Sequence, residues 1–552
     1  MADASPTAND MRFPSGSRRA WALFSGLSVV AIVVAIVAWM RSNSDDKPVA
    51  KNRGGNSARQ NVVHQPSEWE ALLAASPYRN VQPGVGYVSD AKCAECHGEI
   101  AADYAKHPMG RSLAPTAKAE PIEQFTAEAR HPLTIEGFVY QVRQEDGRQF
   151  HRETRLSPAG KEALAMEFEA VYAVGSGTAG RSYIIERDSH LFMSPLTWYA
   201  DHGWDLSPGY EVNNSHFNRP VVAECLFCHA NRAAHVEGTL NEYKPPIFSG
   251  YSIGCQRCHG PGELHVAAHE RGETVEERDL TIVNPAHLSP ALRESVCQQC
   301  HLGGLVRLEK NRRRTDDFRP GLPWSAVQAV YLAAGGEPSG SEAGHEHTER
   351  FVGHVEQMHQ SGCYIGSNGK LGCISCHDPH RKPEAAAKVE FYRQRCLKCH
   401  GETDCELPVA ARRERQADDS CYSCHMPHED TQIRHAAATD HRIPRSPDST
   451  RRTPAVRPNP DWSPLLDIQS LVVTNPEGGK TAKKPAAANV ALSATENRNL
   501  AIALVRAMDR HSEVVDERVL PRALKMLDDA VRRDPADIAA RDAYAYALGR
   551  NR

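Results

Sequence analysis

Seven copies of one short motif, Cys-x-x-Cys-His, constrain this chain of 552 residues more than any other feature of its sequence. The motif is the signature of covalent haem attachment, in which two thiols add to the haem vinyl groups and the adjacent histidine ligates the iron. We therefore expect seven covalently bound haem c groups. Such macrocycles provide much of an apolar core, so the chain around them is expected to form short helices and loops.

Each motif supplies two attachment cysteines and one histidine on the proximal side of an iron. The expected attachment residues are Cys93, Cys96, Cys225, Cys228, Cys255, Cys258, Cys297, Cys300, Cys373, Cys376, Cys396, Cys399, Cys421 and Cys424. The expected proximal ligands are His97, His229, His259, His301, His377, His400 and His425.

Other roles for paired cysteines explain this pattern less well. Structural zinc sites do not require a histidine directly after every pair. A thioredoxin-like Cys-x-x-Cys would occur once and on a βαβ pattern, which the sequence lacks. A disulfide framework would leave seven identically placed histidines unexplained. Two cysteines, Cys363 and Cys405, lie outside the motifs. They are expected either to pair with each other or to stay as thiols.

The distal side of each iron needs a second ligand, and 20 of the 27 histidines lie outside the motifs. His380 and His428 stand out because each follows a proximal histidine by three residues, with a proline between them. Met109 competes with its neighbour His107, because a thioether would raise the potential of that haem. We expect two histidine ligands at most irons. The distal candidates are His107, His235, His265, His354, His380, His428 and His435.

The N-terminal segment predicts export and a membrane anchor. Residues 20–40 carry no charge and follow Arg12, Arg18 and Arg19. Twenty-one such residues can cross the hydrocarbon core, whereas a secretory h-region is shorter and ends at a small-residue cleavage site. Since c-type haem is attached outside the cytoplasmic membrane, residues 1–19 are expected in the cytoplasm and the rest on the periplasmic side. A cleaved signal peptide is the alternative.

Composition changes along the chain divide it into segments. The fold class expected is mainly α with extensive irregular structure, interrupted by a β-rich insertion and ending in helical hairpins. The boundaries expected are a linker at 41–85, a first haem segment at 86–120, the β-rich insertion at 121–212, a domain with six haem motifs at 213–445, a linker at 446–490 and helices at 491–552.

The β-rich insertion is predicted by alternating polar and apolar residues. Residues 138–143 and 152–156 alternate on either side of Glu145-Asp146-Gly147, which is a hairpin signal. The aromatic residues at its end, Trp198, Tyr199 and Trp204, are expected to pack in a core rather than to bind a substrate.

The last sixty residues show helical periodicity in 497–508, 522–533 and 536–548. The segment from Ala523 to Asp534-Pro535, together with the alanine-rich segment that follows it, resembles a tetratricopeptide repeat. Fewer than three repeats do not bury their own apolar face. The helices are therefore expected either to pack on the haem domain or to continue in a longer chain.

The motifs and the residues around them resemble those of a known family of cytochromes. The sequences Cys-His-Asp-Pro-His at 376–380 and Cys-His-Met-Pro-His at 424–428, and the run 354–358, are similar to multihaem cytochromes of the hydroxylamine-oxidoreductase and nitrite-reductase superfamily, and to the tetrahaem electron carriers related to it. Segments 204–210 and 369–380 resemble large periplasmic cytochromes with a C-terminal tetratricopeptide array. The chain departs from the nitrite reductases because it has no Cys-x-x-Cys-Lys motif.

Two functions remain open. In the first, which we favour, the protein carries electrons between redox protein partners, recruited by the helical tail or the β-rich insertion. In the second, one haem lacks a distal protein ligand and acts on a small nitrogen or sulfur oxyanion. A nucleic-acid partner is not indicated, because the formal net charge is −4 and phosphate binding needs clustered lysine and arginine.

Overall fold

The computed structural model describes residues 67–273, 278–333, 353–429, 438–445, 465–467, 492–512, 515 and 517–551. The predicted anchor at 20–40, most of the two predicted linkers and His435 lie outside these residues. Among the described helices, none is both long and apolar enough to cross a membrane.

The prediction of a mainly α fold is wrong, because the described residues form five antiparallel sheets as well as helices. Strands extend from Leu113 to Phe248, beyond both ends of the predicted insertion. The larger sheet of this region has the order β1-β6-β7-β8-β10, with β9 also paired to β8. Its strands are β1 (Leu113–Pro115), β6 (Tyr172–Val174), β7 (Gly180–Arg187), β8 (His190–Tyr199), β9 (Gly203–Leu206) and β10 (Arg219–Pro220).

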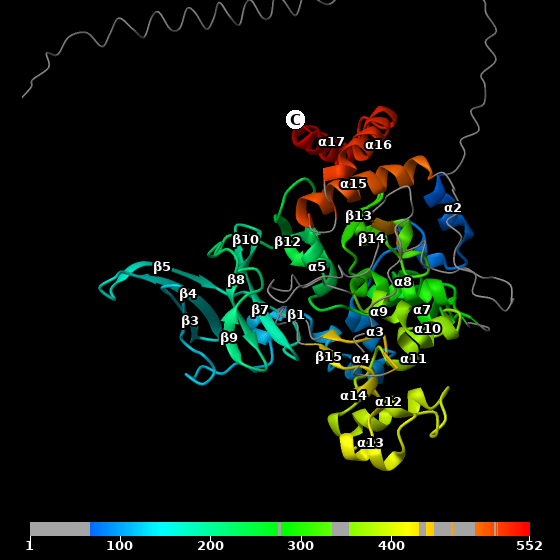
Figure 1. The fold of residues 1–552 in the computed structure, drawn as a ribbon, viewed down its shortest axis with the longest axis horizontal. Coiled ribbons are helices and arrows are strands. Elements are labelled where there is room, and N and C mark those ends of the chain that lie inside the picture. Colours follow the sequence, from blue (N-terminus) through cyan, green and yellow to red (C-terminus); the bar gives the residue numbers. More distant parts are fainter. Residues whose placement is uncertain are drawn as a thin grey trace, which may run out of the picture. The chain divides into compact units, whose positions relative to one another are not determined.

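A second sheet in the same region is a four-stranded meander. Its strands are β2 (Leu133–Ile135), β3 (Phe138–Glu145), β4 (Arg148–Leu156) and β5 (Glu162–Glu169). The β3–β4 hairpin turns at Asp146 and Gly147, whose φ values of 49° and 74° match the two-residue turn that the sequence predicts. Figure 1 shows these strands in cyan and blue-green, apart from most of the helices.

Aromatic side chains form the core between these sheets. Trp204 is fully buried, and its ring lies 5.7 Å from Tyr183 and 5.6 Å from Trp198. Its indole N–H donates to the Gln124 carbonyl at 2.8 Å, so the buried polar atom has a partner. The aromatic segment that ends the region therefore packs in a core, as predicted.

The haem motifs lie on short helices or at their ends, and loops join these helices. A helical turn places residues three apart on one face, so both thiols of a motif point the same way. The helices are α2 (Glu68–Ala75), α3 (Asp90–Ala94), α4 (Gly98–Tyr104), α5 (Ala223–His229), α6 (Gln256–His259), α7 (Glu263–Glu270), α8 (Pro290–His301), α9 (His354–Gln360), α10 (Gly362–Gly366), α11 (Cys373–Cys376), α12 (Lys388–Cys396), α13 (Val409–Arg415) and α14 (Cys421–His425).

Three small sheets lie among these helices, where the sequence shows no alternation. Pairings of two to four residues are too short to leave a periodic signal in the sequence, so no pattern predicts them. The strands are β11 (Ala233–His235) with β12 (Tyr243–Phe248), β15 (His428–Glu429) with β16 (Ala438–Thr439), and β13 (Val306–Glu309) with β14 (Gln328–Ala333) and β17 (Leu465–Asp467).

The C-terminal helices pack on the last of these sheets (Figure 1). Helices α15 (Ala494–Arg510), α16 (Leu520–Arg533) and α17 (Ile538–Arg550) occupy the three predicted segments. Leu504 and Leu527 share a buried cluster with Val306, Leu308 and other residues of β13 and β14. The helical tail therefore buries its apolar face on the domain that carries the motifs, which is the first of the two expected outcomes.

Candidate haem-binding cavity

One connected cavity of about 5240 Å³ is lined by all seven motifs. Each of the 14 motif cysteines and seven motif histidines contributes to its wall. Ordinary small-molecule pockets measure roughly 300–1000 Å³, so this cavity has room for several large cofactors. Two thiols and an imidazole at every motif are the donor set that covalent haem requires. The residues present therefore fit haem c.

All 16 cysteines lie in described residues, and the structure joins none of them in a disulfide. Cys363 and Cys405 also line the cavity. Burial raises the pKa of Cys258 to about 12, so this thiol is neutral at physiological pH. A buried, neutral thiol at Cys258 provides apolar surroundings that suit the edge of a haem macrocycle.

Neighbouring motifs contact one another through their cysteines. The sulfurs of Cys93 and Cys255 and an Asp90 oxygen lie within 4.8 Å of one another. Three further pairs of cysteines bring different motifs together in space, and two of these pairs join motifs more than 70 positions apart in the chain. The contacts are Cys228 with Cys300, Cys297 with Cys373, and Cys396 with Cys421. The spatial order of the motifs thus differs from their order in the sequence.

Four proximal histidines face a second imidazole across the cavity. A metal–imidazole bond is about 2.0 Å long, so two imidazoles on opposite sides of one metal have ring centres about 6 Å apart. The ring centres are separated by 6.4 Å for His97 and His265, 6.0 Å for His259 and His380, 5.6 Å for His301 and His354, and 6.2 Å for His377 and His441. Each pair has the spacing that an iron between two imidazoles needs.

Hydrogen bonds orient several of these rings. The Nδ1 atoms of His259, His441 and His425 lie 2.7, 2.7 and 2.9 Å from the carbonyl oxygens of Val283, Thr439 and Pro444. An Nδ1–H that donates to a carbonyl leaves the lone pair of Nε2 for a metal. Burial lowers the pKa of His354 and of His377 to about 4, so both imidazoles are in the neutral form that binds iron.

The predicted distal residues fall into three groups. His265, His354 and His380 face a proximal imidazole, as described above. His107 and His428 line the cavity, and His107 Nδ1 accepts from the Met109 N–H at 3.2 Å. Met109 also lines it. His235 instead lies in β11, with its ring 5.4 Å from that of Tyr243 and outside the cavity wall.

Sequence reasoning did not single out His441. It lies 64 residues after its partner His377 and follows no Pro-His spacing, so no local signal identifies it. Its place is set by the β15–β16 hairpin and by its backbone N–H, which donates to Gln357 Oε1 at 2.8 Å. His269, His287, His359 and His511 also line the cavity.

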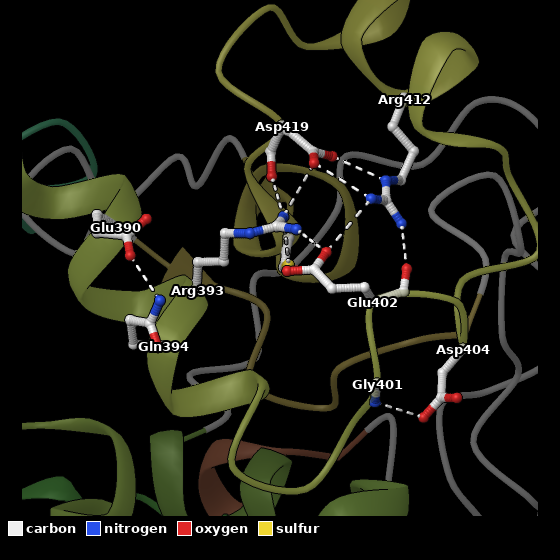
Figure 2. A network of polar contacts seen from close by, with 9 residues as sticks. Glu390, Arg393, Gln394, Gly401, Glu402, Asp404, Arg412 and Asp419 are labelled. Carbon is white, nitrogen blue, oxygen red and sulfur yellow. Dashed lines mark hydrogen bonds and ion pairs between the residues drawn. The ribbon is translucent and has the colours of Figure 1, made fainter.

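A partly exposed ion-pair network joins the last two motifs (Figure 2). Arg412 donates to Asp419 Oδ1 at 2.8 Å and to the Glu402 carbonyl at 3.1 Å. Arg393 donates to the Asp419 carbonyl at 2.9 Å, pairs with Glu402 and lies 3.7 Å from the Cys421 sulfur. Because Glu402 follows His400 and Asp419 precedes Cys421, the two arginines connect both attachment segments.

Comparison with known proteins supports the same assignment. The family model described as a doubled CXXCH motif matches residues 367–404, which hold the fifth and sixth motifs. No curated protein matches the chain.

Among solved structures, the chain is similar to the crystal structure of the outer cell wall cytochrome OcwA, with 14% identity and a TM-score of 0.39 over 84% of this chain and 100% of that one. The doubled motif, with seven donor sets around one cavity, supports a multihaem c-type cytochrome.

Proposed function

We propose that the protein is a heptahaem c-type cytochrome that transfers electrons on the periplasmic side of the cytoplasmic membrane, to which residues 20–40 anchor it. The observation that carries this proposal is the lining of one connected cavity by all seven donor sets. Separate cavities would have suggested isolated cofactors.

Haem, when bound, supplies an iron that accepts and releases one electron. The chain's own residues would hold each macrocycle by two thioethers and would ligate its iron with histidine. Electron transfer also requires neighbouring sites to be close, and the thiol contacts provide this. The first motif contacts the third, the fourth contacts the second and the fifth, and the sixth contacts the seventh.

Two more interactions join these groups into one route. Cys258 of the third motif lies near Cys297 of the fourth, and Cys376 of the fifth lies near Cys399 of the sixth. The proposed route therefore runs through the first, third, fourth, fifth, sixth and seventh motifs, and the second motif joins it at the fourth.

We propose two histidine ligands for the irons of the first, third, fourth and fifth motifs, with His265, His380, His354 and His441 on the distal sides. Two strong-field imidazoles make an iron low spin. The expected partners are redox proteins that dock on the C-terminal helices or on the β-rich region. We also propose that the protein is related to the hydroxylamine-oxidoreductase superfamily and that its C-terminal helices are related to tetratricopeptide repeats.

Two measurements on the exported full-length protein test the function. Intact mass is expected to show seven haem additions, and fewer additions from a host with a competent maturation system would contradict the haem count. Electron paramagnetic resonance of the oxidised protein is expected to show low-spin signals. A stoichiometric high-spin signal that responds to nitrite or hydroxylamine would instead support an enzyme that acts on a small oxyanion.

A further inference from the structure

One imidazole of the cavity has a carboxylate as its Nδ1 partner. His265 and His269 lie on one face of α7, four residues apart, and Asp279 lies beside them. His265 Nδ1 is 2.7 Å from Asp279 Oδ2. The side chains of His265 and Asp279 are 23% and 18% exposed, so this hydrogen bond is largely shielded from water.

Two observations fix the orientation of this pair. The ring centres of His265 and His97 lie 6.4 Å apart, and Nδ1 of His265 is bonded to Asp279, so Nε2 of His265 would be left for the iron of the first motif. The other carboxylate oxygen, Asp279 Oδ1, accepts from the Thr281 N–H at 2.7 Å and from the Thr281 hydroxyl. Asp279 is therefore held in place from the side opposite the imidazole.

The other oriented rings have neutral partners. His259, His425 and His441 have backbone carbonyls beside Nδ1, and the nearest Asp404 oxygen to His400 Nδ1 is 3.8 Å away, beyond hydrogen-bond distance. A hydrogen bond to a carboxylate is stronger than one to a neutral carbonyl and makes the imidazole more basic. A more basic axial ligand stabilises ferric over ferrous iron and so lowers the potential.

We infer that Asp279 is a positioning residue that lowers the potential of the haem attached at Cys93 and Cys96 below those of the haems ligated by His259–His380 and His377–His441. This inference rests on the proposed function. It gives the route a direction: electrons that enter at the first motif move to higher potential at the third, whose Cys255 contacts Cys93.

The same three side chains offer an alternative. The ligand atoms of His265, His269 and Asp279 lie within 4.8 Å of one another, a spacing that a divalent metal accepts. In that case His265 would ligate the metal through Nδ1 and Asp279 would not be its hydrogen-bond partner. The separation of 6.4 Å between the ring centres of His265 and His97 favours the haem assignment, and the experiment separates the two.

The experiment is a redox titration of the full-length holoprotein followed by electron paramagnetic resonance. The haem concerned is identified as the one that His265→Ala converts to high spin. Asp279→Asn keeps the size of the side chain but removes its charge, so the potential of that haem is expected to rise. A tenfold loss of preference for the ferric state corresponds to 59 mV for one electron. Asp279→Glu restores the charge and is expected to recover much of the shift.

Asp201→Asn is the matched control. Asp201 Oδ1 lies 2.6 Å from His202 Nδ1 on the β-rich region, and neither residue lines the cavity, so this change should move no haem potential. An unchanged potential in Asp279→Asn, with His265→Ala still producing a high-spin haem, would overturn the inference and leave the proposed function intact.

Two other outcomes would also overturn the inference about Asp279. If His265→Ala leaves every haem low spin, the His97–His265 pair is not an axial pair and the inference fails. Stoichiometric zinc in the wild-type protein that His269→Gln removes would identify a separate metal site and overturn it as well. Loss of haem from the wild type itself would instead contradict the proposed function.

Discussion

At the scale of single residues, the separation between imidazoles carries most of the functional argument. His380 lies three residues after one proximal histidine, His377, yet its ring centre lies 6.0 Å from that of another, His259, from the third motif. The proline between His377 and His380 directs the chain away from the iron of the fifth motif. The Pro-His spacing therefore connects the fifth and third haem sites and does not supply both ligands of one iron. His441 then takes the position opposite His377.

This arrangement makes a direct prediction for His380→Ala. The covalent haem count should not change, because His380 is outside every attachment motif. One iron should become high spin and its midpoint potential should shift, because a methyl group cannot ligate iron. Intact mass and electron paramagnetic resonance check both parts. His235→Ala is the control, since His235 lies against Tyr243 outside the cavity wall, and a spectral change there would contradict the assignment.

At the scale of elements, the β-rich region depends on a buried histidine. Burial lowers the pKa of His151 to about 3, and its Nδ1 lies 2.7 Å from the Ser194 hydroxyl. The unfolded chain, with an ordinary pKa near 6.5, binds a proton that the folded chain excludes. Stability contributed by neutral His151 is therefore complete above about pH 6.5 and is lost as the pH falls toward 3, by about 1.4 kcal/mol per pH unit.

His151→Gln should flatten this acid dependence while lowering stability at neutral pH by about 1–3 kcal/mol, because a buried hydrogen bond is lost. Urea unfolding followed by circular dichroism between pH 4 and 7 measures both effects. His190→Gln, at the start of β8, should keep the wild-type slope. An equal slope in wild type and His151→Gln would assign the acid sensitivity to other groups.

The C-terminal helices depend on one buried ion pair. Arg498 Nε and Nη2 donate to the two Asp537 oxygens at 2.7 and 2.8 Å, and Nη1 donates to the Glu309 carbonyl at 3.2 Å. Arg498→Met leaves the Asp537 carboxylate buried without its partner, which typically costs about 3–5 kcal/mol. Limited proteolysis should then cleave the tail earlier. Arg532→Met removes an exposed pair with Asp528 and should leave the free energy of unfolding nearly unchanged.

At the scale of the whole molecule, the size of the cavity couples folding to cofactor attachment. A wall that includes all seven motifs has few apolar partners across it unless macrocycles fill the space. Protein made without a haem-attachment system should therefore lose amide protection in α5, α8 and α11 to α14. Hydrogen exchange measures this loss, and the aromatic core around Trp204 should stay protected because it contacts no motif. Equal protection in both preparations would contradict the coupling.

The sequence alone determined the features that depend on neighbours within a few residues. Covalent attachment needs two thiols and a histidine at fixed spacing, so the motifs identified their own chemistry. The Asp146-Gly147 turn and the three C-terminal helices are also local, because turn geometry and helical periodicity are set by adjacent residues. The fold class was wrong in part because β1, β10 and β17, which lie outside the predicted insertion, pair with β6, β8 and β14 and not with the next strand in the chain, so no local hairpin signal predicts them.

Only the tertiary structure decided which imidazoles face each other. The His377–His441 and His97–His265 pairs join residues 64 and 168 positions apart, and no spacing in the sequence specifies such a contact. The order of the motifs in space has the same origin, since Cys93 contacts Cys255 rather than a cysteine of the next motif. Attachment is a property of a five-residue segment, whereas ligation across an iron depends on how separate segments pack around the same cavity.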